Sequence, residues 1–203
     1  MDEELEKHWD DKYTDGGAGV SWYQDDPAVS LELIATVSPS RSEAVIDVGG
    51  GASPLVGRLL ALDYVDVTVI DISRVSLAQS ASRNRSDGRV TYIHGDILGW
   101  VPQREYRLWH DRAVLHFLTE PSDVDRYRKV LGEALGVGGT AIIGVFSDDG
   151  PQYCSGLPVR RYSPVELAGV LGDRFEVVAQ RRELHRTPAG AEQAFTWIAA
   201  KRT

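Results

Sequence analysis

Short runs of apolar residues alternate along this chain with longer segments whose apolar positions recur at helical spacing. The short runs predict strands at residues 44–48, 65–70, 90–94, 107–110, 138–146, 175–184 and 194–200. The longer segments predict helices at residues 3–13, 27–37, 54–62, 73–84, 122–135 and 164–171, with a loop at 14–26. Five strands in parallel units followed by a terminal antiparallel hairpin indicate an α/β protein with a Rossmann-like, doubly wound sheet.

Three of these helices begin with residues that are typical of helix starts. A short polar residue caps each helix, and a proline or an acid follows it at a favoured position. These pairs are Asp26 with Pro27, Ser53 with Pro54, and Ser163 with Glu166.

Length, composition and charge restrict the class of protein. A chain of 203 residues is long enough for one sizeable domain, and 42% hydrophobic with 26% charged residues is typical of soluble proteins. No apolar run approaches the ~18 residues of a membrane span, and the acidic N-terminus does not resemble a secretory signal. The net charge of −8 argues against nucleic-acid binding, and the single Cys154 fits a reducing compartment. We therefore expect a cytoplasmic protein without nucleic-acid or membrane partners.

A glycine-rich loop follows the first predicted strand in the stretch VIDVGGGASPL, residues 45–55. A phosphate-binding Walker loop requires a Lys-Ser/Thr pair after its last glycine, and none is present. The dinucleotide fingerprint G-x-G-x-x-G begins with Gly49 and Gly51, but Pro54 stands where its third glycine belongs. This departure weakens the NAD interpretation and leaves it open.

Acidic residues at the ends of successive strands favour a cationic ligand with a ribose. Asp47 precedes the three glycines, Gly49, Gly50 and Gly51, and its charge would repel a pyrophosphate but attract an ammonium or sulfonium group. Asp71 ends the second strand 20 residues after Gly51, where such folds place a carboxylate on the ribose hydroxyls. After the third strand, Asp96 can accept the adenine amino group and Ile97 can cover the ring.

These motifs, in the order VIDVGGG, VTVIDIS, IHGDI, YRLWHDRAVLHFL and GGTAIIGVF, resemble the class I S-adenosylmethionine-dependent methyltransferases over residues 44–146. The resemblance implies a seven-stranded sheet of order 3-2-1-4-5-7-6 with strand 7 antiparallel. It also implies that Gly49 and Gly51 lie under the methionine moiety, that Asp71 binds the ribose hydroxyls, and that Asp96 and Ile97 hold the adenine. Gly50 and Ile72 are further candidate cofactor-binding residues. Asp111, at the end of the fourth strand, would lie near the methionine amino group. Ser53 replaces a glycine that the family often retains.

The N-terminal segment resembles a subgroup that includes small bacterial methyltransferases and protein-lysine methyltransferases. The similar residues are Trp-Asp-x-x-Tyr at 9–13 and Ser-Trp-Tyr-Gln at 21–24. In that subgroup such a segment covers the cofactor, which makes Trp22 and Tyr23 candidate lid residues. Packing of these aromatic side chains against the core is the alternative interpretation.

Candidate residues for the methyl acceptor follow the fourth and fifth strands. Asp111 and His116 are the candidate catalytic residues, because His116 lies five residues beyond Asp111 and can act as a base; a packing role for His116 is equally compatible with the sequence. The remaining candidates are Phe117, Cys154, Arg161, Tyr162 and His185, of which Cys154 fits a structural role and His185 an exposed turn. No set of residues has metal-ligand spacing.

The sequence thus predicts a single methyltransferase domain over residues 1–203, with S-adenosylmethionine as cofactor. Within it we expect a helical lid at 1–40, a cofactor-binding core at 44–146 and an acceptor side at 147–203. The absence of a large inserted domain favours a small-molecule acceptor, and a protein lysine is the alternative. An NAD-dependent oxidoreductase and a non-catalytic cofactor-binding module remain open, and the oligomeric state is not determined.

Overall fold

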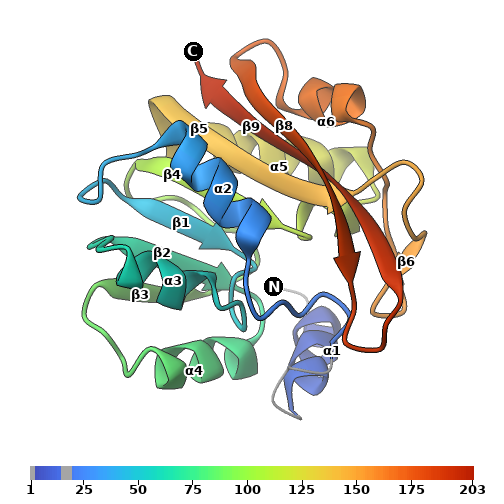
Figure 1. Ribbon diagram of the computed structural model, residues 1–203, viewed down its shortest axis with the longest axis horizontal. Helices are drawn as coiled ribbons and strands as arrows, with labels where there is room; N and C mark the ends of the chain where they lie inside the picture. Colours follow the sequence, from blue (N-terminus) through green and yellow to red (C-terminus); the bar gives the residue numbers. More distant parts are fainter. Residues whose placement is uncertain (1–2, 15–19) are drawn as a thin grey trace.

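A twisted, seven-stranded sheet runs through the computed structural model, which describes residues 3–14 and 20–203 (Figure 1). The order of its strands is β3-β2-β1-β4-β5-β9-β8. In chain order the strands are β1 (Val45–Val48), β2 (Val67–Asp71), β3 (Val90–His94), β4 (Tyr106–Arg112), β5 (Leu135–Phe146), β8 (Phe175–Arg186) and β9 (Glu192–Arg202). Strands β1 to β5 pair in parallel, whereas β9 is antiparallel to both β5 and β8. The predicted strand order 3-2-1-4-5-7-6, with the last strand antiparallel, is confirmed.

Helices cover both faces of this sheet (Figure 1). Side chains of α2 and α3 pack on one face and those of α5 and α6 on the other, which explains why β1 and β2 are buried along their whole lengths. Helix α4 packs on β2 through Leu77 and Val69. The helices are α1 (Glu3–Tyr13), α2 (Ala28–Val37), α3 (Leu55–Ala61), α4 (Arg74–Arg83), the 3-10 helix η1 (Leu115–Phe117), α5 (Pro121–Ala134) and α6 (Pro164–Leu171).

The starts of two helices differ from the sequence prediction. Pro27 is the N-cap of α2 rather than its first residue, and the Asp26 carboxylate lies 3.3 Å from Arg58 instead of capping the helix. Pro54 is likewise the N-cap of α3, although the Ser53 hydroxyl accepts a hydrogen bond from the Leu55 amide at 3.1 Å. At α6 the predicted capping box between Ser163 and Glu166 is confirmed.

A short hairpin that the sequence pattern did not predict follows β5. It consists of β6 (Tyr153–Cys154) and β7 (Leu157–Pro158), which pair antiparallel across Ser155 and Gly156. In a two-residue strand no alternation can develop, so the hydrophobic pattern gives no signal for it. The hairpin places Cys154 at the edge of the sheet that carries the candidate site.

The strand register brings the carboxyl ends of β1, β2, β3 and β4 to one edge of the sheet. Val48 is paired with Ile70 and with Asp111, and Asp71 with His94. Helix α1 lies across this edge (Figure 1), and the loop predicted at 14–26 falls partly outside the described residues. In the described part of the chain, no helix combines the length and the apolar character needed to cross a membrane.

Candidate functional site

A cavity of about 350 Å³ lies at the carboxyl edge of the sheet, between the strand ends and α1. This volume falls within the ~300–1,000 Å³ that is usual for small-molecule sites, and the edge is where open α/β sheets bind ligands. Its wall is formed by the ends of β1, β2, β3 and β4, by η1, by the β6–β7 hairpin and by aromatic side chains of the N-terminal segment. The predicted residues Trp22, Gly49, Asp71, Ile72, Asp96 and Ile97 all line it.

Gly49, Gly50 and Gly51 form a turn, here called the glycine turn, that packs closely against Val114 and against Ser76 and Asp71. Gly49 has φ +66°, and a Cβ atom at this position would lie 2.2 Å from Cγ2 of Val114. A Cβ atom at Gly51 would lie 2.0 Å from the Ser76 hydroxyl and 2.7 Å from Asp71 Oδ2. Gly51 itself does not line the cavity; its amide donates to Asp71 Oδ2 at 3.0 Å and so fixes that carboxylate.

Asp71 presents a buried carboxylate at the end of β2. Its two oxygens accept hydrogen bonds from the backbone amides of Gly51 and of Ser73, the latter at 2.8 Å. Burial raises the pKa of this carboxyl to about 6, and the two amide donors act against that shift. Each carboxylate oxygen has a second lone pair, so Asp71 can accept further hydrogen bonds from a ligand in the cavity.

The loop after β3 forms the adjoining wall. The Asp96 carboxylate accepts a hydrogen bond from the Leu98 amide at 2.9 Å, which closes a tight turn and brings Ile97 and Leu98 onto the cavity. Apolar side chains and a carboxylate in one turn can hold a flat ring with an exocyclic amino group.

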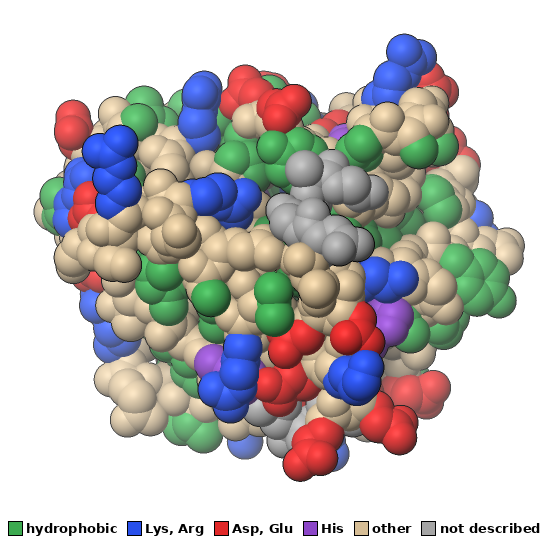
Figure 2. Space-filling view, turned by 90° about the horizontal axis from the view of Figure 1, so that it is seen from below, with side chains coloured by type: hydrophobic (Ala, Val, Ile, Leu, Met, Phe, Trp, Pro, Cys, Tyr) green, Lys and Arg blue, Asp and Glu red, His purple; other side chains and the backbone are tan. Residues whose placement is uncertain are grey.

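Aromatic side chains of α1, of the segment after it and of η1 line one side of the cavity. Trp9 contacts both Trp22 and Phe117, with ring centroids 5.6 and 5.0 Å apart, and Trp22 Nε1 donates to the Tyr13 hydroxyl at 3.2 Å. Trp9, Tyr13, Trp22 and Phe117 all line the cavity. On the face seen in Figure 2, acidic and basic side chains are interspersed among uncharged ones.

Polar contacts fix α1 to the start of α4. The Asp10 carboxylate accepts hydrogen bonds from the Ser73 hydroxyl at 2.6 Å and from the Val75 amide at 3.1 Å, so α1 supplies a second cap for α4. Glu6 pairs with Arg74 at 3.0 Å and lies 3.1 Å from His94. Helix α1 is thus fastened to the residues that directly follow Asp71.

Replacing Asp10 by alanine is expected to loosen α1 without unfolding the sheet. Loss of a capping carboxylate typically costs about 1 kcal/mol, or roughly fivefold in the local opening equilibrium. Hydrogen exchange of the amides of residues 3–14, followed by mass spectrometry, measures this opening. Asp11→Ala is the matched control, because Asp11 pairs with the exposed Lys7; equal exchange in the two variants would contradict the assigned role of Asp10.

A second, smaller cavity of about 50 Å³ adjoins the first on the other side of the glycine turn. Asp47, Gly49, Gly50 and His110 line it. Asp47 Oδ1 lies 2.7 Å from His110 Nδ1, whereas Asp47 Oδ2 is buried and has no hydrogen-bond partner among the described residues. A Cβ atom at Gly50 would lie 2.1 Å from that oxygen, so only glycine leaves room for the carboxylate.

Ser30, His110 and Asp47 form a hydrogen-bonded chain that matches a serine hydrolase triad by residue type. The Ser30 hydroxyl lies 2.9 Å from His110 Nε2. Ser30 is 1% exposed, and its cavity is too small for an acyl substrate. The chain therefore fixes the orientation of Asp47 rather than supplying a nucleophile.

Asp111 lines neither cavity. Its side chain is fully buried and lies beside α5, where one carboxylate oxygen accepts from the Val114 amide and the other from the Leu115 amide and the Tyr127 hydroxyl. The Tyr127 hydroxyl in turn accepts from Trp109 Nε1 at 3.0 Å. Burial raises the pKa of Asp111 to about 6. Strand alternation explains the correction, since Asp111 points away from the face that carries His110 and Arg112.

His116 is also outside the cavity. It lies in η1, as a turn or short helix was predicted, but it is fully buried against Phe117 and Phe146, with ring centroids 4.4 and 4.6 Å away. Its Nδ1 accepts from the Phe146 amide, and burial lowers the pKa of the imidazole to about 3. A neutral, enclosed histidine does not act as a base on a ligand in this cavity, so the packing interpretation holds.

The remaining acceptor candidates separate into two groups. Cys154 lines the cavity as a neutral thiol, because burial raises its pKa to about 11. Tyr23, a candidate lid residue, lines the smaller cavity. Arg161 donates to the Gly150 carbonyl, Tyr162 is buried in the core beside α6, and His185 contacts the Ser21 carbonyl at 2.8 Å. His185 is 5% exposed on β8, so its prediction as an exposed turn residue is wrong.

Among residues 3–14 and 20–203, no group of three His, Cys, Asp or Glu is placed to hold a metal ion.

Comparison with solved structures relates this architecture to known proteins. No protein-family model and no curated protein matches the sequence. The 1,6-didemethyltoxoflavin-N1-methyltransferase of Burkholderia thailandensis, with 1,6-didemethyltoxoflavin and S-adenosylhomocysteine bound, aligns with a TM-score of 0.79 and 21% identity over 98% of this chain and 87% of its own. The chain has the class I methyltransferase fold.

Two further structures with the methyltransferase fold align over most of their lengths. An S-adenosylmethionine-dependent methyltransferase from Anabaena variabilis gives a TM-score of 0.74 at 16% identity, with 98% of this chain and 93% of the other covered. The N-methyltransferase NodS from Bradyrhizobium japonicum, in complex with S-adenosylhomocysteine, gives 0.68 at 14% identity, with 88% and 89% covered.

Within this methyltransferase fold, sequence reasoning missed Arg112. The residue ends β4 and lines both cavities, and burial lowers the pKa of its guanidinium group. Its sequence signal was available, since Arg112 directly follows the predicted Asp111 at a strand end, and neighbouring strand residues point to opposite faces. The cavity-lining hairpin residues Leu157 and Pro158 were missed as well, and no local pattern marks them.

Proposed function

We propose that this protein is an S-adenosylmethionine-dependent methyltransferase that acts on a small-molecule acceptor. The observation that carries the proposal is the convergence of the glycine turn, Asp71 and Asp96 from three consecutive parallel strands on one cavity under an aromatic lid. The related structures support it, because two of them are named N-methyltransferases and contain S-adenosylhomocysteine.

The residues of the cavity fit this cofactor. Asp71 is proposed to accept hydrogen bonds from the ribose hydroxyls, with Ile72 beside them, and Asp96 and Ile97 to hold the adenine. The Gly49–Gly50 turn would lie under the methionine moiety. The unpartnered Oδ2 of Asp47 is a site for the methionine ammonium group, since a buried carboxylate oxygen without a donor is costly until a cation or donor reaches it.

The protein contributes alignment and water exclusion to the reaction. When bound, S-adenosylmethionine supplies a methyl group on a positively charged sulfur, which leaves as a neutral thioether. Trp9, Trp22 and Phe117 shield the cavity from water and provide flat apolar surfaces for the acceptor. No histidine is among the described residues that line the cavity. We propose that the acceptor binds as a ready nucleophile and loses its proton to solvent or to a carboxylate.

The position of α1 over the cavity favours a small acceptor over a protein lysine. The N-terminal resemblance to lysine methyltransferases raised that alternative, but α1 lies over the cavity and is held there by Asp10 and Glu6. We also propose that the chain keeps the predicted division into a lid at 1–40, a core at 44–146 and an acceptor side at 147–203.

Two measurements test this proposal. Calorimetric titration of the purified protein with S-adenosylhomocysteine and with NAD should give binding by S-adenosylhomocysteine alone. Incubation with methyl-labelled S-adenosylmethionine and a cell extract, followed by size separation, should place the label in the low-mass fraction. Binding by NAD alone would overturn the methyltransferase proposal, and label in protein lysines would overturn the small-molecule acceptor.

A further inference from the structure

Polar contacts account for much of what holds helix α1 over the cavity. Within the described residues 3–14, Tyr13 is the one buried side chain. Asp10 makes two polar contacts with the start of α4, and Glu6 makes two more through a single oxygen, Oε1. A segment with few buried contacts opens more readily than the core, so a change in one of these contacts shifts its opening equilibrium.

Glu6 Oε1 lies between two basic side chains of different kinds. It accepts a hydrogen bond from Arg74 Nε at 3.0 Å and lies 3.1 Å from His94 Nε2. A guanidinium group stays charged in proteins, whereas an imidazole gains or loses its charge between pH 5 and 8. The attraction of Arg74 for Glu6 is therefore constant, and that of His94 depends on pH.

The second contact of the His94 ring decides where its proton is exchanged. Nε2 also lies 3.1 Å from the carbonyl oxygen of Ile72, and because a carbonyl only accepts, Nε2 carries a hydrogen. Titration therefore takes place at Nδ1, and it places a full positive charge on a ring that already contacts Glu6. The side chains of His94 and Glu6 are each 18% exposed, so solvent screens this attraction less than that of a surface pair.

Charged groups on the elements beside His94 act on the protonated ring. They are Glu6 on α1, Arg74 at the start of α4, Asp71 as the register partner of His94 on β2, and Asp96 two residues after it. The three acids attract the protonated ring, and Arg74 repels it. Burial raises the pKa of Asp71 to about 6, so this acid loses its own charge over the same pH range. A test of His94 therefore compares proteins that all retain Asp71.

We propose that His94 and Glu6 form a pH-dependent latch, which holds α1 over the cavity more firmly when the His94 ring is protonated. The latch acts at the cavity wall, because Ile72, which the same ring contacts, lines the cavity. Its effect on the exchange of the cofactor rests on the proposed function. A latch that acts on the opening of α1 slows entry and release to the same extent, so it changes the rates of exchange and leaves the affinity nearly constant.

The first experiment measures the opening of α1 without any ligand. Hydrogen exchange of the amides of residues 3–14 is followed by mass spectrometry at pH 5.5 and pH 8.0, and each rate is divided by the intrinsic rate at that pH. We expect the protection of the wild type to be about three- to tenfold higher at pH 5.5, the size expected for one partly shielded ion pair. His94→Gln retains an N–H donor for Ile72 but does not titrate, so its protection should change less than twofold.

Glu6→Gln tests the same contact from the side of the helix. The variant lowers the protection of α1 at both pH values, because it weakens the contact with Arg74, and it should also lose the pH dependence. Since Glu6 belongs to α1 rather than to the sheet, this variant carries the test if His94→Gln does not fold.

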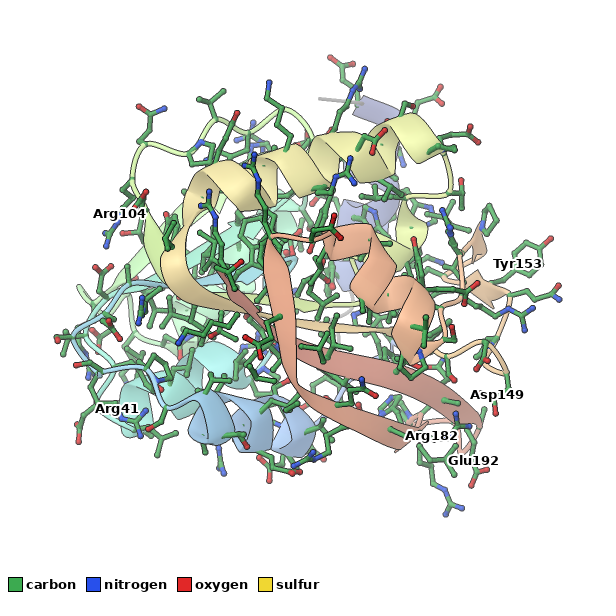
Figure 3. All side chains as sticks on the ribbon, turned by 90° about the horizontal axis from the view of Figure 1, so that it is seen from above. Arg41, Arg104, Asp149, Tyr153, Arg182 and Glu192 are labelled. Carbon is green, nitrogen blue, oxygen red and sulfur yellow. The ribbon has the colours of Figure 1, made fainter. Side chains whose placement is uncertain are left out.

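Two controls separate the latch from other charges. His8 is a second imidazole on α1, and its ring contacts Trp9 at 5.2 Å between centroids rather than Glu6. Asp66 directly precedes β2 and pairs with Arg104, which Figure 3 shows on the side of the molecule opposite to Tyr153 of β6. His8→Gln and Asp66→Asn should both keep the pH dependence of the wild type. Its loss in either control would assign the effect to charges outside the latch.

The second experiment measures exchange at the site. Release of S-adenosylhomocysteine is followed by stopped-flow fluorescence of Trp9 and Trp22, which both line the cavity. Release from the wild type, relative to release from His94→Gln, should be about three- to tenfold slower at pH 5.5 and equal within twofold at pH 8.0. Failure of the wild type to bind S-adenosylhomocysteine would overturn the proposed function, and the first experiment would still decide the latch.

Two further results would overturn the inference. The same pH dependence of α1 exchange in the wild type and in His94→Gln would show that the charge of His94 does not hold the helix. Protection that depends on His94, together with release rates that do not, would show that the latch has no role in exchange at the site.

Discussion

Asp71→Ala is expected to weaken binding of S-adenosylhomocysteine by about a hundredfold or more. Hydrogen bonds to a charged group typically contribute about 1.5–3 kcal/mol each, and two ribose hydroxyls are proposed to share this carboxylate. The variant also leaves the amides of Gly51 and Ser73 without their acceptor, which loosens the turn under the ligand. Asp71→Asn retains one acceptor oxygen and the shape of the side chain, so we expect a smaller loss of about tenfold. Calorimetric titration measures both values.

The pH dependence of this binding follows from the raised pKa of Asp71. At a pKa of about 6 the carboxyl of the free protein is mostly protonated at pH 5 and mostly ionised at pH 7. The ionised form is the better acceptor, so the affinity of the wild type for S-adenosylhomocysteine should rise about tenfold between pH 5 and pH 7. Asp71→Asn is the control for every other group, including Asp111, and its affinity should stay nearly constant. A parallel rise in both proteins would assign the effect to another residue.

The raised pKa of Asp71 also predicts how the free energy of unfolding of the ligand-free protein depends on pH. The folded pKa of Asp71 and of Asp111 lies above the unfolded value, so each carboxyl favours the folded state fully below pH 4. That contribution is lost as the pH rises through about 6. The free energy of unfolding from these two groups therefore falls between pH 4 and pH 6, and Asp71→Asn should reduce the slope.

Tyr127→Phe is expected to lower the free energy of unfolding by about 2–4 kcal/mol while leaving the affinity for S-adenosylhomocysteine within twofold. Removing the hydroxyl takes from the buried Nε1 of Trp109 its only hydrogen-bond partner in the described part of the chain, and it takes one of the donors from Asp111. Each buried polar group left without a partner costs about 1–3 kcal/mol. Urea unfolding and calorimetric titration of the same preparation measure the two quantities.

Tyr23→Phe provides the matched control for that experiment. Its hydroxyl donates to Asp25 at the surface, at 2.9 Å, and its loss should cost less than about 0.5 kcal/mol. The comparison decides the role of Asp111, which the sequence placed near the methionine amino group. An unchanged stability together with a tenfold weaker ligand affinity in Tyr127→Phe would return Asp111 to the cofactor site.

The sequence by itself determined the architecture, because the architecture depends on local pattern. Buried strands read as short apolar runs, helices as periodic ones, and the terminal hairpin follows from a connection too short for a crossover. The positions of Asp71 and Asp96 near the ligand site were predictable for the same reason. The carboxyl ends of adjacent parallel strands meet at one edge of the sheet, so it was enough to place the strands correctly along the sequence.

Only the tertiary structure decided which polar residues face the cavity. Asp111 and Arg112 are neighbours in the chain, and the packing of Tyr127 on one face and of Phe195 on the other assigns the acid to the core and the guanidinium to the cavity. His116 became inaccessible because Phe146, 30 residues later, covers it. A side chain's protonation and its free hydrogen-bonding atoms depend on groups brought to it from distant parts of the chain, and a one-dimensional pattern does not contain those distances.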